Sequence, residues 1–158
     1  MSSSELRDLY QQVIVDHHRK PRNFRKLAAP TRSAEGYNPL CGDTVTVEIE
    51  LDGDVIRDIG FHGSGCAISR ASASLMTADV KGKAVADAQA AVAHFRAMLT
   101  DDSDAAAGTE VRERLGKLAV FEGVREFPSR IKCATLPWHT LAAALGGRAE
   151  PVSTEREE

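Results

Sequence analysis

The 158-residue sequence has few aromatic residues and no strong excess of charge of either sign. Phe, Trp and Tyr make up 5% of the chain, and the formal net charge is −3, with the two signs mixed along it. A nucleic-acid-binding surface usually needs a basic excess, often with aromatic residues among the basic ones. The composition therefore gives no indication of a nucleic-acid partner and is otherwise that of a globular protein with a core.

Long apolar segments are also absent. No run approaches the roughly 20 apolar residues that a membrane-spanning helix needs. The N-terminal sequence MSSSELRDLYQQ lacks the basic and apolar regions of a secretory signal peptide. We therefore expect a cytoplasmic protein without a membrane partner, in a compartment where thiols stay reduced.

Cysteine is scarce, and the sequence has no CxxC pair. The three cysteines are Cys41, Cys66 and Cys133. An odd number argues against a framework of disulfides. In a reducing compartment a single cysteine is most often a small buried apolar residue, and otherwise a metal ligand or a nucleophile. The neighbours of each cysteine have to decide between these roles.

Apolar periodicity indicates which segments form helices and strands. Helical spacing predicts a helix over residues 4–18, which Pro21 ends. Alternation predicts strands over 44–51 and 54–62, joined by a tight turn at Asp-Gly, and a further extended segment at 31–38. Further helices are expected at about 68–76, 84–99 and 109–118.

The last expected helix starts near Cys133 or Ala134, because Pro137 is tolerated only in a first turn. These elements predict an α+β fold, with a small antiparallel sheet of about three strands and helices packed on one face. Residues 1–148 are expected to form a single domain. The polar residues 149–158 are expected to be a flexible tail.

The three cysteines share one kind of position, the end of a predicted element. Cys41 lies in a turn before a strand, Cys66 follows the Gly63-Ser64-Gly65 turn at a helix start, and Cys133 begins another expected helix. Free backbone amides at a helix start favour the thiolate, which is the form that binds metals and attacks sulfur. Side chains at element ends can also converge on one point.

Asp43, two residues after Cys41, completes a set of three sulfurs and one carboxylate. Such a set suits a tetrahedral zinc site, and Gly42 allows the chain to bend between its two neighbours. The candidate ligands are Cys41, Asp43, Cys66 and Cys133. Their spacing matches no short zinc motif, so the residues alone leave a metal site, a reactive thiol and plain core packing open.

Two basic residues, Arg130 and Lys132, lie close to Cys133 in the chain. Either can offset the negative charge of a thiolate and carboxylate set, and Arg130 can hydrogen-bond Asp43. We therefore expect them to support the site or to dock a partner. The simpler alternative is a solvated basic patch.

Four segments of the sequence together resemble a known family. They are YQQVIVDHHRKPRN, YNPLCGD, GSGCAIS and RIKCATLPW, in this order. They resemble the SufU branch of the IscU/NifU-like iron–sulfur assembly proteins, and the resemblance spans residues 5 to about 146. It implies the IscU/SufU-like fold, and it implies that Cys41, Asp43, Cys66 and Cys133 are the functional set.

Two features distinguish this chain within the family. IscU-type scaffolds carry a histidine immediately before the last cysteine, where this chain has Lys132. The segment GTEVRERLGKLAVFEGVREFPSR resembles an insertion that SufU-like proteins carry ahead of the last helix. The resemblance thus implies a zinc-dependent sulfur acceptor for a SufS-type cysteine desulfurase, which passes sulfur to a downstream acceptor or cluster assembly complex.

Cys41 is the residue expected to accept the sulfur, because it lies on a loop and can leave the metal to attack a persulfide. The alternatives are a scaffold that holds a transient iron–sulfur cluster on the same residues and a structural domain stabilised by zinc. Neighbouring histidines on a helix point in different directions, so His17 and His18 are not expected to bind one ion together. His62 and His139 are only spare ligands in this reading.

Overall fold

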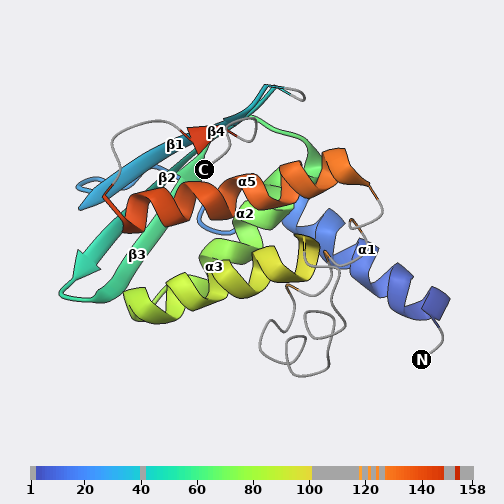
Figure 1. Cartoon of the computed structure of the whole chain (residues 1–158), viewed down its shortest axis with the longest axis horizontal. Coiled ribbons are helices and arrows are strands. Elements are labelled where there is room, and N and C mark those ends of the chain that lie inside the picture. The colour runs from blue at the N-terminus through green and yellow to red at the C-terminus, as the bar shows by residue number, and fades with distance from the viewer. Residues whose placement is uncertain are drawn as a thin grey trace.

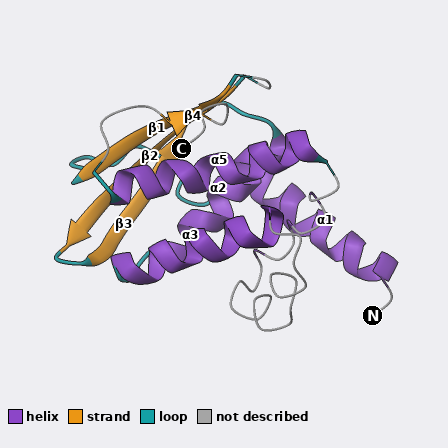
Figure 2. Ribbon diagram, viewed as in Figure 1, coloured by secondary structure: helices purple, strands orange, loops and turns teal. Residues whose placement is uncertain are grey.

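The computed structural model of the chain describes residues 3–39, 42–100, 127–147 and 152–153, and positions 118, 121 and 124. Figures 1 and 2 show the elements in these ranges. They are α1 (Ser3–Arg19), β1 (Arg32–Asn38), β2 (Asp43–Asp52), β3 (Val55–His62), α2 (Ala67–Val80), α3 (Val85–Thr100), α5 (Pro128–Leu145) and β4 (Val152–Ser153). The helix expected over 109–118 lies outside the described residues except for Leu118.

The sheet is an antiparallel meander, β3-β2-β1, with β4 added at the free edge of β1. Gly53 and Asp54 form the two-residue turn between β2 and β3, and Gly53 has a φ of 62°. The sequence signal for this hairpin is therefore confirmed. β4 pairs in parallel with β1 inside the segment expected as a tail. The open edge of β1 offers the unpaired backbone groups with which these two residues pair.

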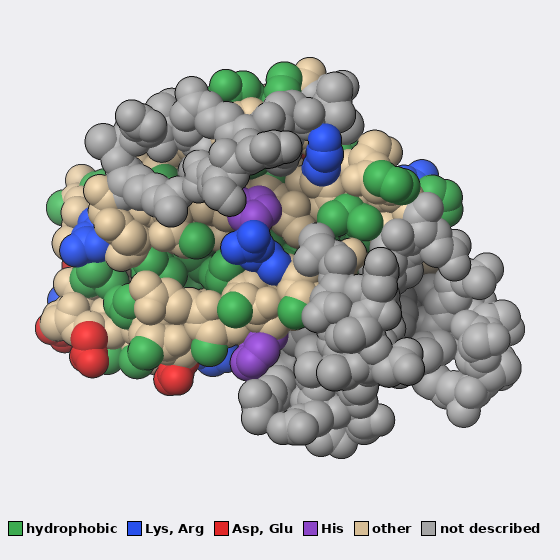
Figure 3. Space-filling view, in the orientation of Figure 1, with side chains coloured by type: hydrophobic (Ala, Val, Ile, Leu, Met, Phe, Trp, Pro, Cys, Tyr) green, Lys and Arg blue, Asp and Glu red, His purple; other side chains and the backbone are tan. Residues whose placement is uncertain are grey.

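Helices cover one face of the sheet, as predicted. α5 lies across β1 and β2, and α2 packs against β3 on the same side, while α1 and α3 pack mainly on the other helices (Figures 1 and 2). Alternate residues of β2 are buried under this layer, which explains the alternation in the sequence. Figure 3 shows the α5 and α3 side of the molecule, where the described surface carries few charged side chains. No helix in the described ranges is long and apolar enough to cross a membrane.

The start of α5 differs from the sequence expectation. The helix begins at Pro128 rather than near Cys133, and Pro137 lies in its interior. An interior proline removes the amide that would bond to the carbonyl of Cys133. Burial of Leu136 and Trp138 in the core holds the helix in spite of this loss. Cys133 therefore lies in the second turn of α5 and not at its start.

The segment between α1 and β1, residues 20–31, is named the strap here. It runs along the edge of β3, where the Phe61 amide donates to the Asn23 carbonyl at 3.0 Å and the Arg25 amide donates to the Phe61 carbonyl at 2.9 Å. A Cβ on Gly60 would lie 2.6 Å from the Arg25 carbonyl oxygen. Position 60 therefore requires glycine for the strap to approach this closely.

Candidate metal centre

Three of the four predicted ligands meet at one end of the sheet. Asp43 is the first residue of β2, Cys66 is the N-cap of α2, and Cys133 lies in α5. Their ligand atoms all lie within 4.8 Å of one another. Cys41, the fourth predicted ligand and the predicted sulfur acceptor, lies outside the described residues.

Hydrogen bonds hold Asp43 against the start of α2. Its Oδ1 accepts from the Cys66 backbone N–H at 2.9 Å, and its Oδ2 lies 3.7 Å from the Cys66 sulfur. The Thr44 backbone N–H donates to the Ser64 carbonyl at 2.7 Å, which fixes the intervening turn to β2. Gly63 in this turn has a φ of 134°, and a Cβ there would collide with the Thr44 carbonyl oxygen. The glycine-rich turn therefore permits the contact between the carboxylate and the thiol.

The Cys66 sulfur lies at the helix N-terminus, as the sequence predicts. The side chain is exposed, and its sulfur accepts from the Ser69 backbone N–H at 3.5 Å. This is the hydrogen bond of an N-cap, made here by sulfur in place of oxygen. The free amides at the start of α2 thus point toward this sulfur.

Cys133 has a different environment. It is 3% exposed, and the side-chain amide of Asn38 donates to its sulfur at 3.7 Å. Because α5 starts at Pro128, the helix-terminus effect expected for Cys133 does not apply. Sequence reasoning missed Asn38, although it lies within the YNPLCGD segment and faces Asp43 across the β1–β2 pair.

The spacing of the three ligands can be compared with that of a zinc site. Tetrahedral bonds of about 2.3 Å to sulfur and about 2.0–2.2 Å to oxygen give ligand separations of roughly 3.5–3.8 Å. The separation of 3.7 Å between the Cys66 sulfur and the Asp43 carboxylate falls in this range. The donor types therefore suit a tetrahedral site, the Cys66–Asp43 pair has the spacing of one, and all three ligand atoms lie within 4.8 Å of one another.

The two basic residues predicted to support the site lie at the start of α5. The Arg130 side chain is exposed, with its guanidinium carbon 4.7 Å above the ring of Phe127. Within the described part of the chain, the Asp43 carboxylate accepts from Cys66 and not from Arg130. Lys132 is partly buried directly before Cys133. A supporting or docking role for both residues stays a prediction.

The histidines are not part of the ligand group found among the described residues. His17 is buried, with Nδ1 2.7 Å from the Ser74 hydroxyl, and links α1 to α2. His62 has Nε2 3.9 Å from the carboxylate of Glu48. In the structure His17 and His62 thus contact a hydroxyl and a carboxylate of neighbouring elements.

Comparison with known proteins gives consistent matches over most of the chain. Residues 9–135 match the family model of the NifU-like N terminal domain. The zinc-dependent sulfurtransferase SufU of Bacillus subtilis (strain 168) is 40% identical over 141 residues, which are 88% of this chain and 90% of the relative. The iron–sulfur cluster assembly scaffold protein IscU of Streptococcus pyogenes serotype M1 is 37% identical over 145 residues, 92% of this chain and 87% of the relative.

A solved structure agrees with these matches. It is the crystal structure of a candidate iron–sulfur cluster assembly scaffold protein for the SUF system, from the thermophile Fervidobacterium islandicum AW-1. It has a TM-score of 0.78 and 34% sequence identity, and the match covers 85% of this chain and 94% of that chain. The similarity therefore extends to the arrangement of the sheet and helices.

Proposed function

Because the chain belongs to the NifU-like N-terminal domain family of iron–sulfur cluster assembly proteins, we propose that it is a zinc-dependent sulfur-transfer protein of cluster biogenesis. The observation that carries this proposal is the convergence of one carboxylate and two thiols within 4.8 Å. Lys132 at the position before the last cysteine favours the transfer function over the scaffold function.

The proposed zinc site consists of Asp43, Cys66 and Cys133, with Cys41 as the fourth ligand. Zinc, when bound, keeps such sulfurs deprotonated and ordered. Cys66 caps α2 and Cys133 is buried in α5, so both are tied to helices. Cys41 belongs to the short connection between β1 and β2, and it is our candidate for the residue that reaches toward a partner.

In the proposed reaction the Cys41 thiolate attacks the outer sulfur of a persulfide on a SufS-type cysteine desulfurase. A bond forms between the Cys41 sulfur and that outer sulfur, while the sulfur–sulfur bond of the partner breaks. The electron pair of the broken bond leaves with the partner's cysteine as a thiolate, so no external oxidant or reductant is needed. The persulfide on Cys41 then passes its sulfur to a downstream acceptor or cluster assembly complex.

Two further expectations belong to this proposal. A cytoplasmic location is proposed because the reaction needs reduced thiols. A single domain over residues 1–148 follows from the composition and length of the chain. Both stay predictions.

A scaffold that holds an iron–sulfur cluster is the second candidate function. Its support is the donor set itself, because thiolates bind iron as well as zinc, and the 37% identical relative called a scaffold. Metal content after aerobic purification distinguishes the two candidates. A colourless zinc protein favours transfer, whereas a brown cluster that is passed to apo-proteins favours the scaffold.

The decisive experiment measures alanine production by the cognate cysteine desulfurase with and without the zinc-loaded protein. We expect strong stimulation by the wild type and none by Cys41→Ala. No stimulation, with zinc bound and the desulfurase active, would overturn the transfer function. If Cys41→Ser still accepted persulfide sulfur while Cys66→Ser did not, the transfer function would stand and the assignment to Cys41 would be wrong.

A further inference from the structure

Asn38 occupies a position that touches two parts of the metal centre. It is the last residue of β1 and lies directly opposite Asp43, the first residue of β2. Both side chains are buried, with 0% and 2% of their surface exposed. Directly opposed residues of an antiparallel pair present their side chains on the same face, so Asn38 and Asp43 enter the site side by side.

The backbone of Asn38 also closes the connection between the two strands. Its carbonyl accepts from the Gly42 N–H at 2.8 Å. This bond joins the ends of the stretch that contains Cys41 in the sequence. One residue therefore anchors this connection through its main chain while its side chain points toward a different candidate ligand.

The side-chain amide of Asn38 donates to the Cys133 sulfur at 3.7 Å. A fully buried amide is costly unless its polar atoms find partners. A thiolate is a strong acceptor, and donors to ligand sulfurs tune the metal that the sulfurs hold. The contact is thus suited to a sulfur that stays negatively charged and stationary.

We propose that Asn38 is a positioning residue that fixes the Cys133 thiolate as the stationary ligand of the centre. The inference rests on the proposed function, since it takes the four-residue set as a zinc site. Cys133 is buried and receives the amide of Asn38, whereas Cys66 is exposed and receives only a helix amide among the described contacts. The specific donor to Cys133 keeps this sulfur in place while Cys41 is exchanged.

The test measures metal binding rather than sulfur transfer. Variants Asn38→Ala and Asn38→Leu both remove the donor, and leucine restores most of the side-chain volume. We expect both to weaken zinc binding about 10–100-fold, the usual effect of losing a hydrogen bond to a metal ligand. Competition with a chelator of known affinity gives the dissociation constant. A packing role would instead predict that leucine restores the affinity that alanine loses.

Substitution of cobalt for zinc gives an absorption spectrum that a change in packing alone would leave unchanged. Loss of an N–H donor leaves more electron density on the sulfur, so we expect the thiolate-to-cobalt charge-transfer band to shift to longer wavelength in both Asn38 variants. Asn23→Ala is the control, because among the described contacts the Asn23 amide donates to the Thr77 hydroxyl and to none of the ligand sulfurs. It should keep the wild-type band and zinc affinity.

Three outcomes would overturn the inference. The first is wild-type affinity and spectrum in both Asn38 variants, the second is recovery of the affinity by leucine, and the third is an equal loss of affinity in Asn23→Ala. In each of these the wild type binds zinc, so the proposed function survives. A wild type that binds neither zinc nor cobalt would overturn the proposed function and this inference together.

Discussion

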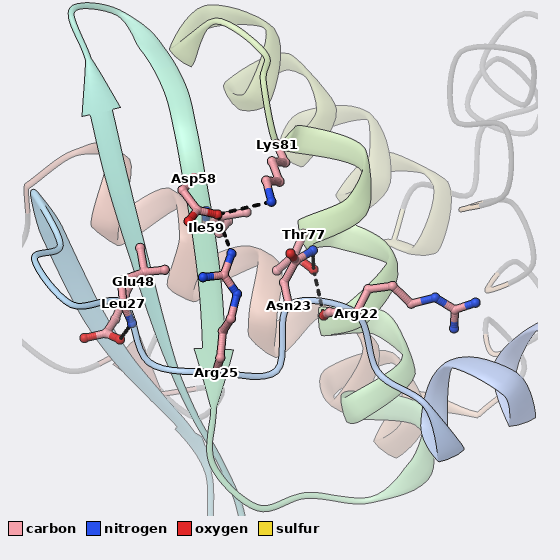
Figure 4. Close-up of polar contacts among 9 residues, drawn as sticks. All are labelled: Arg22, Asn23, Arg25, Leu27, Glu48, Asp58, Ile59, Thr77 and Lys81. Carbon is pink, nitrogen blue, oxygen red and sulfur yellow. Dashed lines mark hydrogen bonds and ion pairs between the residues drawn. The ribbon is translucent and has the colours of Figure 1, made fainter.

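The strap and the metal centre are both places where residues distant in the chain meet, and their polar contacts differ in kind. In the strap, Arg25 donates to Asp58 at 2.6 Å, and Lys81 lies 3.3 Å from the same carboxylate (Figure 4). The Asn23 amide donates to the Thr77 hydroxyl at 3.1 Å, and the Leu27 backbone N–H donates to the Glu48 carboxylate at 3.0 Å. Every one of these contacts joins a donor to an acceptor, or a cation to an anion.

The metal centre gathers groups of the same kind. Asp43, Cys66 and Cys133 all donate electron pairs when they act as metal ligands, and their sulfur contacts measure 3.5–3.7 Å, ordinary lengths for hydrogen bonds of sulfur. When the two sulfurs and the carboxylate are all charged they repel one another, and a cation placed among them would offset this repulsion. The strap thus balances its charges with its own side chains, whereas the other junction gathers the donor set that we propose to hold a metal.

The largest expected effect comes from removing a ligand of the centre. With free zinc at 100 times its dissociation constant, binding stabilises the wild type by about 2.7 kcal/mol. We expect Cys133→Ser to lose this stabilisation. Urea unfolding with and without zinc measures the difference.

Arg25→Ala is the control for this experiment, because it weakens the strap and leaves the centre intact. It should keep the zinc-dependent gain in stability while lowering the stability of the metal-free protein. Equal zinc-dependent gains in Cys133→Ser and the wild type would show that this cysteine does not hold the metal. Unfolding of the wild type on chelation would instead favour a structural zinc domain.

The sequence predicts the sheet well because its signals are local. Alternating Val45, Val47 and Ile49 and the turn at Gly53 specify the central hairpin without help from distant residues. The start of α5 was predicted wrongly from Pro137, because the burial of this helix in the core outweighs the cost of an interior proline. Pro128, a residue type favoured in a first turn, was the available signal.

The sequence predicts which residues belong to the candidate site, but not how their side chains are arranged. The positions of Cys66 and Asp43 at element ends, and the family resemblance, together indicated that distant ligands converge. The contact from Asn38 to Cys133 depends on the exact pairing of Asn38 with Asp43 and on the path of α5. Pairing of this kind is decided by tertiary packing, which periodicity within one segment does not report.

The next expected effect is steric and concerns the strap. Gly60→Ala would place a Cβ 2.6 Å from the Arg25 carbonyl oxygen, so the strap or β3 must shift. We expect a loss of about 1–3 kcal/mol in the free energy of unfolding, as for other overpacked sites. Zinc affinity should not change, since the strap is complete without the metal.

Gly146→Ala is the matched control for this substitution. Its Cβ would lie 3.4 Å from the Ala142 carbonyl oxygen, an ordinary contact, and the backbone φ of −82° suits any residue. Urea unfolding of both variants should show a marked loss only for Gly60→Ala. Equal losses in the free energy of unfolding would mean that the close approach of the strap to Gly60 does not account for the effect of Gly60→Ala.

The smallest expected effect is the pH dependence of the strap. Burial alone raises the pKa of Asp58, but hydrogen bonds from Arg25, Ile59 and Lys81 outweigh it and hold the pKa below the usual 3.8. A lowered pKa in the folded state stabilises the protein fully above about pH 4, and this contribution disappears as the pH falls through the folded value. Because Asp58 is partly exposed, we expect Asp58→Asn to cost only about 1 kcal/mol at pH 7.

The measurement for Asp58 is urea unfolding of the metal-free wild type and Asp58→Asn at pH 7 and near pH 2.5. Removing the metal beforehand is essential, because acid also protonates zinc ligands. The pH effect of the metal centre would otherwise be added to that of the strap. The difference in free energy of unfolding between the two proteins should approach zero at the lower pH. If the difference in free energy of unfolding stayed constant with pH, Asp58 would stabilise the strap by hydrogen bonds that do not depend on its charge. Charge complementarity would then not be the source of the strap's stability.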